Sequence, residues 1–257
     1  MALDLYHWEP TANSGELLIA LNERGIAFTS RYVDLLAFEQ HSPRFLALNP
    51  RGEVPVLVHD GEVLTETTLI LEYLDAAFPS VPRLVPEAPA ERYRMRVWTK
   101  LANDSFAPAL TLLGWHMRMG RYLRQRDRSE ILAGIARLPP DRQAVWRTAL
   151  DDAYTEDQLT RARQFLEVAA RRLEDALATS AWLAGASYSL ADIAIFPLAY
   201  ALQSLLPDVA ALDDRPHVAG WLRRVRERPA VRSALAMGRS ARPEEMFAPG
   251  PELARWG

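Results

Sequence analysis

The first part of the chain alternates short apolar runs with turn signals. Residues 3–8 alternate apolar and polar side chains as a strand does, and residues 17–21 carry the closely spaced apolar positions of a helix, which Gly25 is well suited to end. Residues 27–33 predict a second strand, and residues 35–48 predict a short, irregular helix. A helix between two strands favours a parallel pair within one sheet.

The next stretch carries the sharpest local pattern. An apolar run at residues 56–58 leads into Asp60-Gly61, a strong hairpin-turn signal, and residues 62–64 form the return strand. Thr65-Glu66-Thr67 then opens a helix with a regular apolar face. The resulting order, βαβαββα, predicts a thioredoxin-like domain over residues 1–80.

The chain after residue 90 has apolar residues at the spacing typical of helices. Residues 81–90 contain three prolines and no periodic pattern, and they predict a linker. Ser189 and Asp192 have the spacing of a capping box at the start of a later helix. The fold class is therefore predicted to be α+β followed by all-α, with a helical domain over residues 91–257. Apolar residues recur at helical spacing in residues 91–113, 158–177, 190–205 and 218–228.

The helical series is interrupted around residues 115–155. Trp115 and Met119 continue the first helix, whereas Pro139-Pro140 breaks the pattern before Trp146. This segment predicts an inserted arm that lies over a cleft. Its several arginines are more typical of a solvated face than of an anion site.

The composition of the chain says little about its fold, but it excludes several classes of partner. The 257 residues are 49% hydrophobic and 25% charged, which is typical of a globular protein with an ample core. A net charge of −3 gives no reason to expect nucleic acid as a partner. No apolar run approaches the roughly 18 residues of a membrane span, and the N-terminus lacks a signal core, so we expect a cytoplasmic protein without a membrane partner.

The chain contains no cysteine. Disulfides, thiolate metal sites and a cysteine nucleophile are therefore excluded, and no metal site is predicted. Any thiol chemistry must take its sulfur from a cosubstrate.

Pro55 lies at the entry of a predicted strand, where proline removes one donor from the sheet. If the Val54–Pro55 peptide bond is cis, the N–H and C=O of Val54 turn outward and can pair with a short peptide; a trans proline in an edge hairpin is the alternative. At the following helix start, which carries Glu66 and Thr67, free N–H groups suit a carboxylate and Glu66 suits an ammonium. The γ-glutamyl end of glutathione carries both groups, so these four residues predict a glutathione site.

Asn13 and Ser14 stand between the first strand and the first helix, in a loop that faces Val54 and Pro55 in this fold. A thiolate is the nucleophilic form of a thiol, so an activating site donates hydrogen bonds and positive potential to it. The Asn13 amide and the Ser14 hydroxyl are the available donors, at the positive end of the helix. Asn13 and Glu16 also have capping-box spacing, so Asn13 could serve only as a helix cap.

These motifs together resemble glutathione S-transferases. Val54-Pro55 followed by Glu66-Thr67 resembles the glutathione-binding domain of that family, and Ser189 with Asp192 resembles the capping motif of its helical domain. A narrower resemblance, which covers the N-terminal domain and the start of the helical domain, is to bacterial glutathione-dependent β-etherases of the LigF type, which cleave the β-aryl ether bond of lignin fragments. It rests on residues 12–14, 38–42, 49–52, 59–61, 95–100 and 114–115, whereas the arm matches poorly in detail.

The resemblance implies a reaction and a set of site residues. In the family, glutathione thiolate displaces an aryloxide from the carbon next to a ketone, so we expect a glutathione transferase with a hydrophobic aromatic substrate. Gln40 and His41 would hold the glycyl carboxylate of glutathione, His41 more strongly when protonated. Trp115, Met119 and Trp146 could line the aromatic cleft, although each alone is more typical of a protein core. A homodimer is expected from the family likeness alone.

Two other functions stay open on the sequence. One is general conjugation of glutathione to activated aromatics, or their dehalogenation. The other is glutathione binding without catalysis. A disulfide reductase that uses its own thiol is excluded, because the chain has no cysteine.

Overall fold

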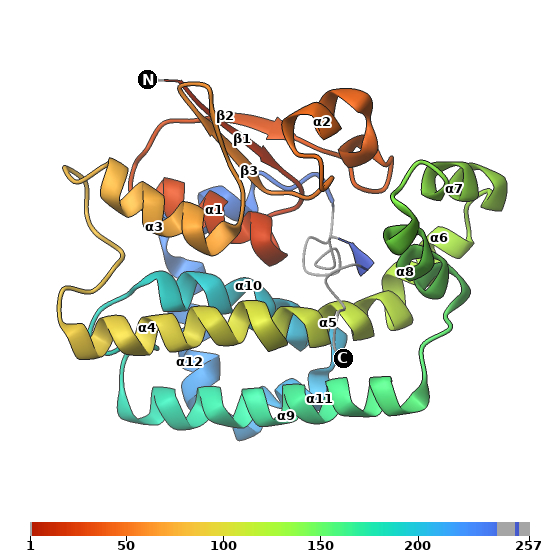
Figure 1. The fold of residues 1–257 in the computed structure, drawn as a ribbon. Helices are drawn as coiled ribbons and strands as arrows, with labels where there is room; N and C mark the ends of the chain where they lie inside the picture. The colour runs from red at the N-terminus through yellow and green to blue at the C-terminus, as the bar shows by residue number, and fades with distance from the viewer. Residues whose placement is uncertain (1, 241–249, 252–257) are drawn as a thin grey trace.

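The computed structural model describes residues 2–240 and 250–251 (Figure 1). A four-stranded sheet with its helices is followed by a series of helices, and this order confirms the predicted fold class. Residues 241–249 and 252–257 of the predicted helical domain lie outside the described residues. Among the described residues, no helix has both the length and the apolar content needed to cross a membrane. The predicted domain boundaries stay predictions.

The sheet has the strand order β2-β1-β3-β4. β1 and β2 run parallel, with Leu5 beside Ser30, and β3 is antiparallel to both neighbours, with Leu57 beside Leu5. Asp60 and Gly61 form the predicted hairpin turn with φ angles of 49° and 93°, a region that glycine adopts readily. The strands are β1 (Leu3–His7), β2 (Thr29–Tyr32), β3 (Val56–His59) and β4 (Glu62–Leu64).

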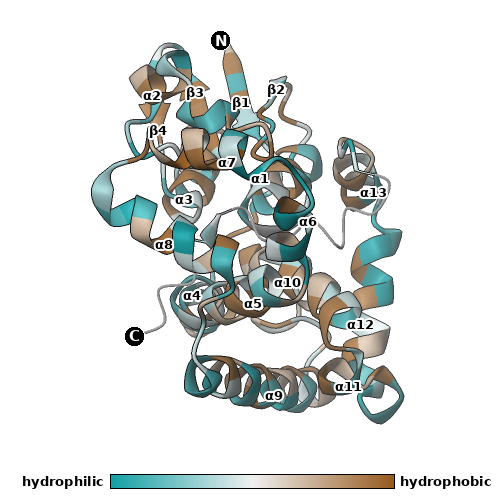
Figure 2. Ribbon diagram, turned by 90° about the vertical axis from the view of Figure 1, so that its right-hand side faces the viewer, coloured by the Kyte–Doolittle hydropathy of each residue, from teal (hydrophilic) through white to brown (hydrophobic). Residues whose placement is uncertain are grey.

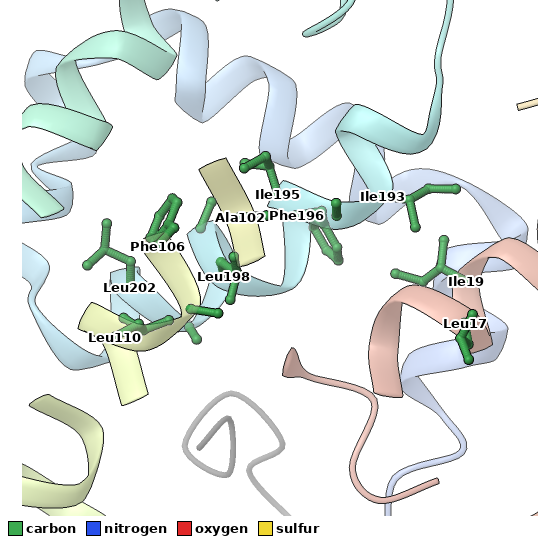
Figure 3. Packing of buried hydrophobic residues seen from close by; sticks show 14 of the residues in the cluster. Leu17, Ile19, Ala102, Phe106, Leu110, Ile193, Ile195, Phe196, Leu198 and Leu202 are labelled. Carbon is green, nitrogen blue, oxygen red and sulfur yellow. The ribbon is translucent and has the colours of Figure 1, made fainter. Parts of the chain in front are cut away.

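Helix α1 (Ala12–Glu23) packs between the sheet and the helical half. Every residue from 17 to 21 is at most 1% exposed, as expected for a helix surrounded by protein. It contacts α3 (Thr67–Ala77) in the first half, and α10 (Leu190–Leu205) and α13 (Pro229–Leu235) in the second. Figure 3 shows Leu17 and Ile19 of α1 near Ile193 of α10.

One long helix opens the helical half, and it extends the predicted helix at both ends. It begins at Pro89, inside the predicted linker. Two of its segments, η2 and η3, are π-helical turns, each of which carries one residue more than an α-helical turn. Its segments are α4 (Pro89–Leu101), η2 (Ala102–Phe106), α5 (Ala107–Gly114), η3 (Trp115–Met119) and α6 (Gly120–Arg124).

Helix α10 forms the centre of the helical half. Its bounds coincide with the prediction, and most of its residues are buried. Figure 3 shows Phe106 and Leu110 of the long helix beside Leu202 of α10. In Figure 2 the hydrophobic residues of α5 and α10 lie in the middle, while α9 alternates hydrophilic and hydrophobic residues at the edge. Helix α10 contacts α11 (Pro207–Ala210) and α12 (Pro216–Glu227), whereas α9 (Glu156–Thr179) contacts α5, α11 and α12, and the 3-10 turn η4 (Leu212–Asp214) contacts α12.

The predicted arm contains two helices, α7 (Arg128–Ile135) and α8 (Pro140–Asp151). They lie at the same end of the molecule as the irregular segment formed by η1 (Glu39–His41) and α2 (Pro43–Leu48) (Figure 1). Arg126 Nη1 donates a hydrogen bond to the Leu36 carbonyl at 2.6 Å. The arm therefore reaches back to the first half of the chain.

Asp192 is a buried carboxylate that ties three segments together. Its Oδ1 accepts hydrogen bonds from Leu183 N at 3.1 Å and Trp221 Nε1 at 2.9 Å, and its Oδ2 accepts one from Ser189 N at 3.0 Å. The Ser189 hydroxyl in turn accepts a bond from Ala191 N, which confirms the predicted capping box. Burial raises the pKa of Asp192 to about 6, and the hydrogen bonds oppose that rise.

We expect Asp192→Ala to lower the free energy of unfolding by about 2–4 kcal/mol, because several buried donors lose their acceptor. Thr155→Ala is a matched control, since it removes the exposed capping box of α9 and should cost only about 1 kcal/mol. Urea unfolding followed by circular dichroism measures both losses. Equal losses in the two variants would contradict the importance of Asp192.

Candidate functional site

A cavity of about 310 Å³ lies where β3 begins, α3 begins and the π-helical turn η2 passes. It brings together segments from both halves of the chain. Of the predicted site residues, Asn13, Val54, Pro55, Glu66 and Thr67 line it. The remaining lining residues are Asn49, Arg51, Glu53, Thr65, Thr68, Leu69, Asn103 and Ala107.

Val54 and Pro55 form one edge of this cavity. Their peptide bond is cis, and the pairing of β3 with β1 begins only at the next residue, Val56. Val54 as a whole is 8% exposed. Within the part of the chain that the structure describes, the Val54 main chain has no hydrogen-bond partner. A main-chain donor and acceptor are therefore available at the cavity.

The start of α3 forms the opposite edge. Glu66 precedes the helix with a φ of 68°, an uncommon value for a residue other than glycine, while its carbonyl accepts a bond from Ile70 N at 3.0 Å. The amino end of a helix carries N–H groups without intrahelical partners and a positive dipole. Thr67 is buried at this helix start, and the Glu66 side chain is exposed beside it. The edge therefore combines N–H donors with one negative charge.

A chain of charges runs along the rim. Arg51 Nη1 lies 3.4 Å from Glu66 Oε1, and Arg51 Nε lies 3.1 Å from Glu53 Oε2. The turn that carries these residues is closed by Asn49, whose Nδ2 donates to the Glu53 carbonyl at 2.8 Å and whose Oδ1 accepts from Arg51 N at 3.1 Å. Neither Asn49 nor Glu53 was predicted from the sequence to line the site, although Asn49-Pro50 is itself a turn signal.

Asn103 adds a side chain from the helical half. It stands in η2, and its Nδ2 donates a hydrogen bond to Thr68 Oγ1 at the start of α3. No sequence pattern identified this residue, because apolar periodicity does not distinguish a π-helical turn from an α-helical one. The contact fixes the start of α3 against the long helix.

Asn13 and Ser14 differ in position. Asn13 lies inside α1, which begins at Ala12 after the N-cap residue Thr11, so the interpretation of Asn13 as a helix cap is wrong. Asn13 lines the cavity, whereas Ser14 is buried and does not. The Ser14 hydroxyl oxygen accepts a hydrogen bond from Trp8 N at 3.1 Å. Of the two predicted thiol donors, Asn13 is thus the one at the cavity.

Gln40 and His41 are both buried, and neither lines the cavity. The His41 ring lies 6.3 Å from the ring of Phe38 and 6.4 Å from that of Trp146. Burial and then the positive charge of Arg142 lower the pKa of His41 to about 4, so its imidazole is neutral at pH 7. The protonated His41 considered from the sequence is therefore disfavoured, because a charged ring would be buried beside a cation.

Trp115, Met119 and Trp146 are packed in the protein core, between 1% and 3% exposed. The rings of Trp115 and Trp146 lie 5.2 Å apart in an edge-to-face arrangement. None of the three lines the cavity. They join the arm to the long helix.

No group of three or more His, Asp or Glu side chains among the described residues is placed to hold a metal ion. The cavity offers hydrogen-bond donors, an amino helix end and a carboxylate instead. Such a set suits a small zwitterionic molecule.

The chain matches two family models. The model of the glutathione S-transferase N-terminal domain covers residues 5–82, and that of the glutathione S-transferase C-terminal domain covers residues 138–229. The chain therefore belongs to the glutathione S-transferase family, in which glutathione is the cosubstrate. Residues 83–137, which include α7 of the arm, lie between the two matched ranges.

Several relatives match over most of their length. The chain is 37% identical over 238 residues to protein LigF from Sphingobium sp. strain SYK-6, which is 90% of this chain and 92% of that protein. It is 30% identical over 225 residues to glutathione S-transferase F14 from Arabidopsis thaliana, or 86% of this chain and 78% of that protein. The crystal structure of beta-etherase LigF from Sphingobium sp. strain SYK-6 has a TM-score of 0.85 at 35% identity, covering 92% of this chain and 99% of that one.

Proposed function

We propose that this glutathione S-transferase is a β-etherase, in which bound glutathione thiolate cleaves the β-aryl ether bond of a lignin-derived ketone. The observation that carries this proposal is the similarity to the β-etherase LigF, at 37% identity and a TM-score of 0.85 over nearly the whole chain. The cavity beside Val54, Pro55 and the start of α3 supports it, because its groups match the main chain and the amino-acid end of glutathione.

In the proposed reaction, the thiolate sulfur bonds to the carbon next to the ketone while the bond from that carbon to the aryl oxygen breaks. The electron pair leaves with the phenoxide, which then takes a proton from water. The adjacent carbonyl makes the carbon electrophilic, and a phenoxide leaves without a strong general acid. The protein has to stabilise the thiolate, position both substrates and exclude water.

We place glutathione along the cavity by its chemical groups. The main chain of Val54 pairs with the peptide backbone of glutathione, and Pro55 keeps that edge out of the sheet. The γ-glutamyl carboxylate lies at the amino end of α3 with Thr67, and Glu66 binds the ammonium. Gln40 and His41, which are buried beside the loop that carries Arg51, support the glycyl end.

Asn13 and the amino end of α1 are the groups that we assign to the thiolate, with Ser14 next to them. A thiol with an ordinary pKa of about 8.5 is only slightly ionised at pH 7, and each unit of decrease needs about 1.4 kcal/mol of preference for the anion. A hydrogen bond from Asn13 and the helix dipole supply that preference.

We place the hydrophobic aromatic substrate next to the arm, which Trp115, Met119 and Trp146 fix against the long helix from within the core. A cytoplasmic homodimer is also part of this proposal. The reaction requires reduced glutathione, which the cytosol maintains. Val63 of β4 and Leu69 of α3, 40% and 65% exposed, provide apolar surface for a second subunit.

Replacing both Glu66 and Thr67 by alanine should weaken glutathione binding by about 100-fold or more, since each lost hydrogen bond to a charged group costs about 1.5–3 kcal/mol. Glu62→Ala removes an exposed carboxylate from β4 and is the control. Isothermal titration calorimetry with glutathione measures the dissociation constants. Affinity retained by the double variant would refute the placement of the γ-glutamyl end.

Incubation with glutathione and a β-aryl ether ketone should release one phenol and form one glutathione thioether for each ether cleaved. Chromatography of both products tests the stoichiometry. An activated haloarene is the comparison substrate. Turnover of the haloarene without phenol release would instead indicate general conjugation, and glutathione binding without either reaction would indicate a non-catalytic module.

Asn13→Ala should raise the pKa of the bound thiol by about one unit, because the anion loses a hydrogen bond worth about 1.5 kcal/mol. Thiolate absorbance of the glutathione complex, titrated against pH, measures this shift. Ser14→Ala is the matched comparison. A larger shift in Ser14→Ala would transfer the role to Ser14, and no shift in either variant would leave the main-chain amides as donors.

A further inference from the structure

Arg142 of α8 is a buried cation on the arm, only 6% exposed. Its Nη2 donates a hydrogen bond to Glu53 Oε1 at 2.5 Å, and its Nη1 donates one to the carbonyl of Arg51. Both acceptors belong to the loop at residues 49–53, about ninety positions earlier in the chain. The arm therefore forms direct hydrogen bonds with a loop that lines the cavity.

The contacts of Arg142 continue along the rim of the cavity. Glu53, its partner, also pairs with Arg51, and Arg51 in turn lies against Glu66 at the start of α3. The four side chains alternate in charge from the arm to the residue proposed to bind the ammonium of glutathione. A shift of Arg142 would change the surroundings of each of the others.

These ion pairs differ in how far they are buried. The difference indicates which of them fixes the loop at residues 49–53. The Arg51 and Glu66 side chains are each 58% exposed, so water and salt screen their attraction. The side chains of Arg142 and Glu53 are 7% and 32% exposed, and loss of one partner of a largely buried pair leaves an uncompensated charge. The Arg142–Glu53 ion pair is thus the stronger interaction and holds the loop in place. The more exposed ion pairs of Arg51 adjust to the conformation that it sets.

Helix α8 itself is fixed on the neighbouring side. Trp146, one turn after Arg142 on the same face, lies 5.2 Å from the ring of Phe38 and 5.2 Å from that of Trp115. Phe38 also lies against Gly134 of α7, where a Cβ atom would meet its ring at 3.3 Å. The guanidinium of Arg142 therefore projects from a helix that has little freedom to move.

We propose that Arg142 is a positioning residue for glutathione: from the arm, it sets the conformation of the loop at residues 49–53 and thereby orients Arg51 and Glu66 toward the cosubstrate. This inference rests on the proposed function, since it assumes that glutathione occupies the cavity. It makes the arm a part of the cosubstrate site and gives it a role besides covering the aromatic cleft.

Arg142→Met tests this role, because methionine keeps an apolar stem and loses every donor. Arg147→Met, an exposed position on the same helix, is the matched control. We expect Arg142→Met to raise the dissociation constant and the KM for glutathione at least tenfold, with kcat at saturating glutathione changed less than twofold. Arg147→Met should match the wild type. A lower melting temperature with unchanged glutathione affinity would reduce Arg142 to a structural residue and overturn the proposal.

A double-mutant cycle with Glu53→Gln tests the same contact from the loop. If Arg142 acts through Glu53, the double variant should bind glutathione about as weakly as the weaker single variant, whereas additive losses would contradict the proposal. Should Arg142→Met fail to fold, Arg142→Lys replaces it in the cycle with the same expectation, because lysine keeps the charge without the two-pronged geometry. Wild-type protein that does not bind glutathione would refute the proposed function itself.

Discussion

Helix α1 packs between the sheet and the helical half, and its residues 17–21 are fully buried. Because α1 contacts α3 in the first half and α10 and α13 in the second, neither half can shift without exposing apolar surface to water. The same helix brings its amino end, with Asn13, to the cavity. The packing of α1 between the two halves therefore determines where the cavity lies. The positions of the polar groups in the cavity depend on this apolar packing.

The cavity uses main-chain ends more than reactive side chains. The chain has no cysteine, and the cavity is lined by a main-chain edge without hydrogen-bond partners among the described residues, by the amino end of α3, and by polar and charged side chains. Such a site is suited to holding a cosubstrate that brings its own nucleophile. The protein contributes position and electrostatic preference, which depend on rigid elements and less on the identity of any one residue.

Local signals in the sequence predicted the local structure well. Asp60-Gly61 specified the hairpin, Ser189 with Asp192 specified the start of α10, and Gly25 ended α1. Each depends on backbone geometry within a few residues. Val54, Pro55, Glu66 and Thr67 were likewise predicted as neighbours and line one cavity, because the turn and hairpin between them are short.

Features that depend on distant contacts were not predicted. Gln40 and His41 are buried because the arm, about one hundred residues later, packs Trp146 and Arg142 against their surroundings. Asn103 reaches the cavity because of a π-helical turn that leaves the apolar pattern nearly unchanged. The N-cap of α1 is Thr11, two residues before the capping pattern at Asn13, and threonine is also favoured at this position, so local preference alone did not distinguish the two.

The second π-helical turn, Trp115–Met119, has a consequence for how this chain tolerates insertions and deletions. Removing one residue there would restore an ordinary α-helical turn and leave the downstream segments in nearly the same orientation, because the wider turn accommodates one extra residue. Removing a residue from an α-helical segment such as α5 would instead rotate everything downstream by about 100°, and the helices that follow would face away from the loop at residues 49–53. The reach of Arg142 therefore depends on the residue count of α5, whereas the π-helical turn can lose one residue without changing it.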